Sequence, residues 1–204
     1  MEQEIQIEEL KKSDYPEMLE LFTCAFKDYP IATTLHLETE KTRAVIETFL
    51  NFFGGMKTAS LYGIRKDNKL VCASLSVDSA TKPSVVSLIR FIFSLMRIFR
   101  HSTREFEKIH SERPKYKERY LELVLISTLP EYQRQGFGRK MLHFLCEKAI
   151  REDYKGVILV VRRDAPALQW YLKEKFSVER EFLCGEVNIC WMRLIFRKDS
   201  ADSA

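Results

Sequence analysis

The feature that most constrains the fold is a glycine-bearing loop between a strand-like segment, residues 120–127, and a helix-like one, residues 141–150. Two glycines let the loop backbone approach a ligand closely. The first N–H groups of the following helix have no intrahelical partner and lie at the positive end of its dipole. We therefore predict a pyrophosphate-binding loop. The loop consists of Gln133, Arg134, Gln135, Gly136, Phe137, Gly138 and Arg139, with Lys140 as a further cation.

The spacing of this loop disfavours two common phosphate-binding motifs. It lacks the third glycine of the dinucleotide fingerprint, and it lacks the Gly-Lys-Ser/Thr of a P-loop. The pattern Gln-x-x-Gly-x-Gly at 133–138, preceded by Pro130-Glu131-Tyr132 and a strand, resembles the coenzyme A loop of the GNAT superfamily of N-acetyltransferases. The alternative is a strand-to-helix turn whose basic residues are merely solvated.

Hydrophobic periodicity predicts an α/β chain. The resemblance to GNAT enzymes implies a mixed, twisted sheet with helices on both faces, in a single domain over 1–204. The expected strands are 60–65, 69–77, 120–127, 156–161, 176–183 and 187–196, after a short opening strand that contains Ile5 and Ile7. The expected helices run from the cap Ser13-Asp14 to Tyr29-Pro30, and over 38–53, 85–99, 141–150 and 166–174.

Composition limits the class of protein. A chain of 204 residues, 46% hydrophobic and 30% charged, is typical of a soluble globular domain. Its net charge of +4 is too small to predict nucleic-acid binding. The five cysteines form no C-x-x-C pair and no His/Cys cluster at metal spacing, which predicts buried free thiols in a reducing compartment and no metal site. Residues 1–4 lack the features of a secretory signal, so we expect a cytoplasmic protein.

One segment departs from a minimal acetyltransferase. Val85–Phe99 is apolar except for Ser87, Arg90, Ser94 and Arg97, whose spacing draws one polar stripe on a helix. We treat residues 84–112 as a helical insertion. A buried helix that covers the sheet is the favoured interpretation, and its alternatives are a substrate-channel lid, a homodimer face or a membrane-surface helix. Its length is below the roughly 20 residues that cross a bilayer.

The resemblance assigns the cofactor-binding residues. In GNAT enzymes the strand before the loop splays from its neighbour, and its free backbone groups pair with the pantetheine arm of acetyl-CoA. The matching positions here are Ile126, Ser127 and Thr128. Asp164 stands where the family has an Asn in its second cofactor segment, and Lys175 stands where it has a Gly. Both departures put local contacts in doubt.

Two residues are expected to carry the chemistry. Glu122 lies where the histone-acetylating branch has its base, and alternation places it on the same side of the strand as Ile126. Its apolar neighbours should raise its pKa if it is partly buried. Tyr171 matches the family tyrosine that protonates the departing thiolate. The alternatives are an ion-paired or solvated Glu122 and a core Tyr171. His110 is a further base or substrate contact, unless it is simply exposed.

These residues predict an acetyl-CoA-dependent N-acetyltransferase that works by direct attack within a ternary complex. We expect a small-molecule amine as acceptor, because the apolar segment at 85–99 would close a compact pocket. The alternatives are a protein lysine or N-terminal amine, a non-catalytic acyl-CoA sensor, and a membrane-associated interaction protein.

Overall fold

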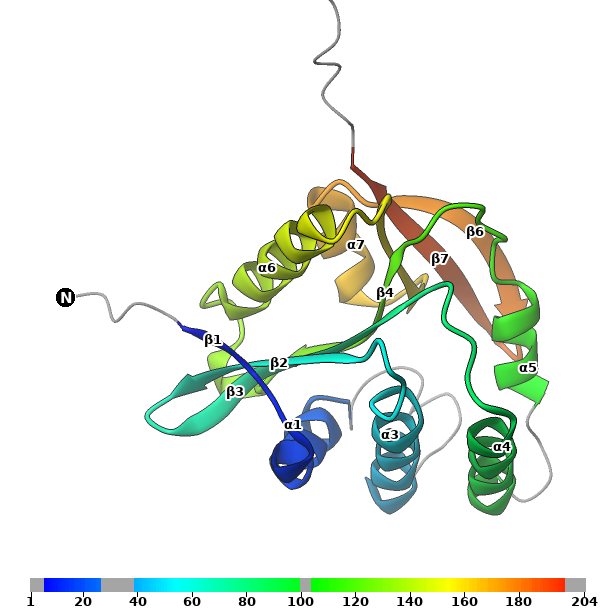
Figure 1. Cartoon of the computed structure of the whole chain (residues 1–204), viewed down its shortest axis with the longest axis horizontal. Helices are drawn as coiled ribbons and strands as arrows, with labels where there is room; N and C mark the ends of the chain where they lie inside the picture. Colours follow the sequence, from blue (N-terminus) through cyan, green and yellow to red (C-terminus); the bar gives the residue numbers. More distant parts are fainter. Residues whose placement is uncertain (1–5, 27–38, 100–103, 197–204) are drawn as a thin grey trace, which may run out of the picture.

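The computed structural model describes residues 6–26, 39–99 and 104–196. Three predicted positions lie outside these ranges. They are Ile5 in the opening strand, Tyr29-Pro30 at the end of the first helix, and Glu38 at the start of the second helix. The described part is a mixed α/β structure built on one sheet with helices on both faces (Figure 1), so the predicted fold class is confirmed.

The sheet contains seven strands within the described residues, in the order β1-β2-β3-β4-β5-β7-β6. Only β4 and β5 run parallel, and every other neighbouring pair is antiparallel. Helix α6 makes the crossover between those two parallel strands, as a parallel connection requires. The strands are β1 (Ile7–Glu9), β2 (Ser60–Lys66), β3 (Lys69–Asp78), β4 (Leu121–Thr128), β5 (Gly156–Arg162), β6 (Ser177–Cys184) and β7 (Val187–Ile195).

The helices form two layers. Helices α6 and α7 cover one face of the sheet, and α1, α3 and α4 lie side by side below the other (Figure 1). Helix α5 lies against β6 at the far end. The helices are α1 (Tyr15–Phe26), α3 (Thr39–Phe53), α4 (Val85–Phe99), α5 (Arg104–Ser111), α6 (Phe137–Arg151) and α7 (Pro166–Lys173), with short 3-10 turns at Lys12–Asp14 and Pro130–Tyr132.

Each face of the sheet has its own apolar core. Leu121 and Leu123 of β4 belong to the core under α6 and α7, together with Met141 and Leu145. Leu75 of β3 belongs to the core under α1 and α3. Because side chains of a strand alternate between faces, β3 serves both cores: Val71 lies in the first, and Leu70 and Ala73 lie in the second. The strands are therefore fixed from both sides.

Helix α6 begins four residues earlier than the sequence predicts, at Phe137 rather than Met141. Gly136 is its N-cap, with φ of 88°. The prediction took residues 137–140 as loop because they contain a glycine and two cations. Once Gly136 makes the turn, nothing prevents those residues from being helical. The second half of the loop is therefore the first turn of the helix.

Helix α4 has the predicted bounds, but the favoured interpretation of it as a buried helix is wrong. Of its large apolar side chains, only Leu95 is buried. The predicted polar stripe is divided: Ser87 and Ser94 are half-buried, whereas Arg90 and Arg97 are exposed. The buried arc of α4 faces α3, beside which it lies, and not the sheet (Figure 1). Among the described helices, none combines the length and apolar character needed to cross a bilayer.

Candidate active site

The two parallel strands at the centre of the sheet stay together for only three residues. Leu121–Leu123 of β4 pair with Val157–Leu159 of β5. Beyond that point β4 continues to Thr128 in register with β3, and β5 continues to Arg162 in register with β7. The side of β4 that faces β5 therefore has no strand partner over 124–128, which includes the predicted pantetheine positions.

A β-bulge interrupts β4 at the place where the strands part. Leu75 and Ser76 of β3 pair with Leu125 and Leu123 of β4, so Val124 is an extra residue. The bulge reverses the alternation of β4. Ile126 packs on the α6 core, whereas Glu122 points to the other face. The prediction that both share one side is wrong, because period-two alternation holds only through an unbroken ladder.

The glycine loop follows β4 directly. Gly136 has φ of 88°, and a Cβ placed there would meet no atom within 4 Å. No contact within the protein therefore demands a glycine, whereas its left-handed backbone does. Two glutamine side chains brace the loop: Gln133 donates to the carbonyl of Thr128 at 3.1 Å, and Gln135 donates to that of Glu131 at 3.0 Å. The loop thus presents the N-terminus of α6 beside the end of β4.

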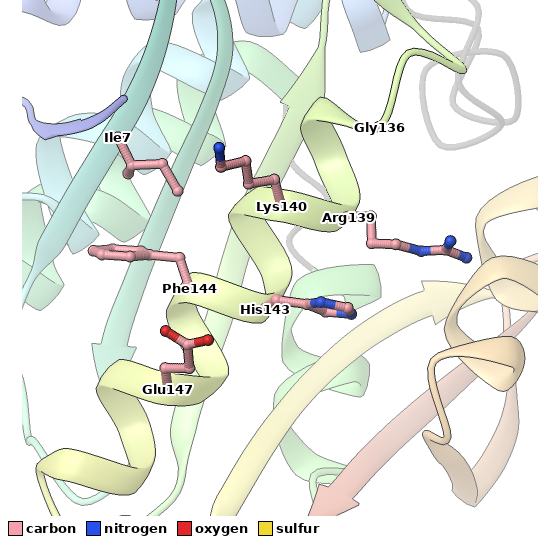
Figure 2. Close-up of a pocket in the computed structure, with 7 residues that line it drawn as sticks. All are labelled: Ile7, Gly136, Arg139, Lys140, His143, Phe144 and Glu147. Carbon is pink, nitrogen blue, oxygen red and sulfur yellow. The ribbon is translucent and has the colours of Figure 1, made fainter. Parts of the chain in front are cut away.

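A shallow depression of about 450 Å³ lies on the outer surface of α6 and begins at this loop (Figure 2). In Figure 2, Lys140 and Phe144 lie on the side of Ile7, whereas Arg139 and His143 point the opposite way. The full lining is Ile7, Gly136, Arg139, Lys140, His143, Phe144 and Glu147. The depression continues from the loop along α6, away from β4, and neither Glu122 nor Tyr171 lines it.

Arg139, a predicted phosphate ligand, already has a protein partner. Its Nε donates to Glu174 at 2.7 Å, and His143 Nε2 lies 2.9 Å from the same carboxylate. Burial of Glu174 opposes ionisation, but the hydrogen bonds from His143 and Arg139 outweigh it and lower the pKa of Glu174. Arg139 therefore ties α6 to the end of α7. Arg134 and Lys140 form no ion pair with any described residue, so they are the cations available at the loop.

Glu122 is a buried carboxylate at the point where β4 and β5 part. Its side chain is 16% exposed and forms an ion pair with Arg113, which lies in the segment after α5. Burial raises the pKa of Glu122, and the charge and hydrogen bond of Arg113 oppose that shift without cancelling it. The expected direction of the pKa shift is confirmed. Glu122 is thus ion-paired and takes up a proton more readily than an ordinary glutamate does.

Arg113 is the residue that sequence reasoning missed. Its guanidinium carbon lies 5.8 Å from the ring centroid of Trp191 in β7. The indole of Trp191 donates to the carbonyl of Ile109 at 3.3 Å, which fastens α5 to the sheet. No sequence signal marks Arg113, because a single arginine before a proline is ordinary in a linker. Its position is fixed by Trp191, 78 residues later in the chain.

Tyr171 lies on the opposite face of the sheet from Glu122, in the core under α6 and α7. It is 6% exposed, and its ring is 4.8 Å from that of Trp170 and 5.4 Å from that of Phe176. Tyr171 is therefore a core residue, which was the alternative interpretation of its helical spacing. A role for its hydroxyl stays a prediction.

Asp164 lies between β5 and α7, where its carboxylate is bound by the buried Arg162. Arg162 donates through Nε at 2.8 Å and through Nη2 at 2.5 Å. These hydrogen bonds lower the pKa of Asp164, although slight burial opposes them. A cofactor role for Asp164 stays a prediction, since its acceptor atoms are occupied by Arg162.

The remaining candidates are peripheral. His110 is exposed on α5. The five cysteines are free thiols. Cys72, Cys184 and Cys190 are buried as predicted, whereas Cys24 and Cys146 are only half-buried.

Comparison with known proteins relates this chain to acetyltransferases. Residues 97–176 match the model of the Acetyltransferase (GNAT) family. A search of curated protein sequences finds no match. Among solved structures, one titled histone acetyltransferase HPA2 and related acetyltransferase, from Corynebacterium glutamicum, superposes with a TM-score of 0.70 at 15% identity, over 98% of this chain and 100% of that one.

Two further structures share the fold. The ribosomal-protein-S18-alanine N-acetyltransferase of Escherichia coli has a TM-score of 0.60 at 15% identity, with 98% and 99% of the two chains covered. The PaiA N-acetyltransferase of Thermoplasma acidophilum, solved in complex with coenzyme A, has a TM-score of 0.57 at 13% identity, with 95% and 100% covered. At these identities the structures establish the fold, while the family match covers the segment with the loop, β4 and Tyr171. Residues 97–176 match the GNAT acetyltransferase family and the chain has the fold of N-acetyltransferases, so it is an acyltransferase whose cofactor is acetyl-CoA.

Proposed function

We propose that this chain is an N-acetyltransferase that moves the acetyl group of acetyl-CoA to the amine of a small molecule, by direct attack within a ternary complex. One observation carries the proposal. A buried carboxylate, Glu122, lies where β4 leaves β5, and the unpartnered stretch of β4 leads from there to the glycine loop. One segment of the chain thus contains, in order, a base, a strand side with no partner, and the start of a helix that could bind an anion.

The residues of this segment suit acetyl-CoA. The open space around Gly136 and the free N–H groups at the start of α6 fit a pyrophosphate, which residues 133–139 would hold. The free side of β4 at Ile126, Ser127 and Thr128 fits an extended amide chain that pairs as an added strand. When bound, acetyl-CoA supplies the acetyl group as a thioester.

Proton movement would use the two faces of the sheet. The carboxylate of Glu122 takes a proton from the amine, directly or through water, because its raised pKa brings it nearer to neutrality. The hydroxyl of Tyr171, approached from the α6 and α7 side, gives its proton to the departing sulfur. A base and an acid on opposite faces suit a transfer in which the nucleophile arrives on one side and the leaving group departs on the other.

The burial of Glu122 supports a small acceptor. Arg113, which lies over the ring of Trp191, pairs with the carboxylate of Glu122, and only 16% of the Glu122 side chain is exposed. A compact amine reaches such a group more readily than a lysine on a folded protein surface. The outward apolar face of α4, in contrast, gives no support to the expectation that this helix closes the acceptor pocket.

An amine screen tests the acceptor. Release of free thiol from acetyl-CoA would be followed with small amines, amino acids, and peptides that carry a lysine or a free N-terminus. We expect turnover with a small amine and none with the peptides. Preferred turnover of a peptide would replace the small-molecule acceptor with a protein. Tight binding of acetyl-CoA with no turnover of any amine would instead establish a sensor.

Calorimetric titration with coenzyme A tests the cofactor loop separately. Gly136→Asp places a carboxylate and a strained backbone where the pyrophosphate would bind, so affinity should fall by about tenfold or more. Lys148→Gln, on α6 but remote from the loop, is the control. Unchanged affinity in Gly136→Asp would remove the loop from the binding site.

A further inference from the structure

Most of the exposed large apolar side chains among the described residues lie on α4. Six of its side chains are between 42% and 72% exposed and form one continuous arc: Val85, Val86, Ile89, Ile92, Phe93 and Met96. We refer to these six as the apolar face of α4. Soluble proteins seldom expose an apolar surface of this extent unless it binds something.

The opposite side of α4 is firmly attached to the protein. The ring of Phe91 stacks on that of Phe52 in α3, with 4.1 Å between the centroids. Phe49 and Phe53 surround the same ring at 5.7 and 6.1 Å. Figure 1 shows α4 beside α3, at the outer end of the row of helices. The apolar face is therefore held outward by packing on the other side of the helix.

The charges beside this face have one sign. Arg90 and Arg97 lie one below the other along one edge of the apolar face, both exposed, and α4 contains no acidic residue. Neither arginine forms an ion pair within the part of the chain that the structure describes. Lys82 adds an exposed cation just before the helix. An anionic surface next to an apolar layer would satisfy both features.

We propose that α4 docks this protein onto the surface of a lipid bilayer that contains anionic lipids. The apolar face enters the boundary between headgroups and acyl chains, with the helix axis parallel to the membrane plane. Arg90 and Arg97 then lie at the depth of the lipid phosphates, and their aliphatic stems cover the edge of the apolar layer.

A second copy of this chain fits the same face less well. A two-fold contact between α4 helices would bring four arginines together, and α4 has no carboxylate to neutralise them. Lipid phosphates supply that negative charge at the required depth. Charge complementarity therefore favours the bilayer over a homodimer.

Vesicle co-sedimentation of the full chain tests the proposal. One set of vesicles contains phosphatidylcholine alone, and the other contains phosphatidylcholine with one quarter phosphatidylglycerol. We expect binding to the anionic vesicles that weakens with salt. Ile89→Glu should lower the partition coefficient by about tenfold or more, because it places a charge in the apolar layer. The double variant Arg90→Ala and Arg97→Ala should lower it by about 25-fold on anionic vesicles only.

Ile150→Glu is the matched control, since Ile150 is 57% exposed on α6 and Ile89 is 60% exposed on α4. Its binding should equal that of the unmodified chain. Thermal melting of each variant checks that it is folded. The proposal is overturned if the unmodified chain stays in the supernatant with both vesicle types, or if Ile89→Glu binds as well as Ile150→Glu. It is also overturned if sedimentation velocity shows a dimer that Ile89→Glu dissociates.

Discussion

Two carboxylate–arginine pairs lie at the two central strands, and burial gives them opposite character. Glu122 of β4 is 16% exposed and pairs with Arg113, whereas Asp164, just after β5, is 64% exposed and pairs with Arg162. The pKa of Glu122 is raised because desolvation exceeds the effect of its arginine. The pKa of Asp164 is lowered because its hydrogen bonds to Arg162 dominate. An arginine neighbour alone therefore does not determine how readily a carboxyl group ionises.

The opposite pKa shifts of Glu122 and Asp164 suggest a catalytic role for the first carboxylate and a stabilising role for the second. A raised pKa means that ionised Glu122 destabilises the folded state at neutral pH, and such a cost is typical of catalytic groups. A lowered pKa means that ionised Asp164 stabilises the folded state, as a structural pair does. We expect the first pair to control turnover and the second to act mainly on folding.

The largest expected effect is that of Glu122→Gln. Without the base, kcat/KM should fall by about 10² to 10⁴-fold near neutral pH and recover partly in alkali, where more amine is already deprotonated. In the unmodified enzyme, activity should rise with pH through the raised pKa of Glu122, because only the carboxylate accepts a proton. Asp164→Asn is the matched control and should retain most of the activity. Equal losses in both variants would end the distinction between the pairs.

Tyr171→Phe tests whether the region after β5 supplies the acid that protonates the departing sulfur. Asp164 lies in the same region, but its pairing with Arg162 is structural. Only the hydroxyl is lost, so the ring packing against Trp170 and Phe176 remains. We expect kcat to fall by about 10²-fold with little change in coenzyme A affinity or melting temperature. Steady-state kinetics with calorimetry measure both. An unchanged kcat would assign proton donation to another group or to water.

Arg113→Gln sharpens the description of the Glu122 pair. The arginine charge holds the pKa of Glu122 below the value that burial alone would give. Its removal should move the acidic limb of the kcat/KM profile to higher pH. Arg180→Gln, which removes the partner of Glu112 instead, should leave the limb in place. If the limb moves to lower pH, or not at all, Arg113 does not tune Glu122.

The smallest effect concerns the stability of Asp164→Asn. Because Asp164 is largely exposed, we expect a loss below about 1 kcal/mol in unfolding free energy at pH 7. Its lowered pKa means that the stabilisation is present above the ordinary aspartate pKa and disappears as the pH falls through the lowered value. Denaturant unfolding at pH 7 and in acid measures this. A difference from the unmodified chain that grows in acid would have the wrong sign.

Much of the local structure was predictable. The spacing of apolar residues gave the bounds of α4 and placed the described strands and most other helices to within a few residues, because periodicity depends on neighbours in the chain. Helix α5 was not predicted as a separate helix. The loop around Gly136 was predicted from residue types alone, since a left-handed turn before a helix needs a glycine. The expectation that burial raises the pKa of Glu122 also followed from its apolar neighbours.

Other features depended on contacts between distant segments. The bulge at Val124, which turns Glu122 away from Ile126, arises from the register between β3 and β4. Arg139 looked available to a phosphate, but Glu174 of the α7 end binds it. The apolar face of α4 looked suited to a core because the sequence does not say which element packs against it.

The sequence by itself determined the order of the strands and most helices, the glycine-bearing turn at Gly136 and the resemblance to the GNAT superfamily. These depend on backbone preferences and short-range spacing, which are local properties. Only the tertiary structure decided that Glu122 is paired with Arg113, that Asp164 is paired with Arg162, and that α4 turns its apolar face outward. Burial and partner choice depend on which surfaces meet, and pairing across the sheet settles that at long range.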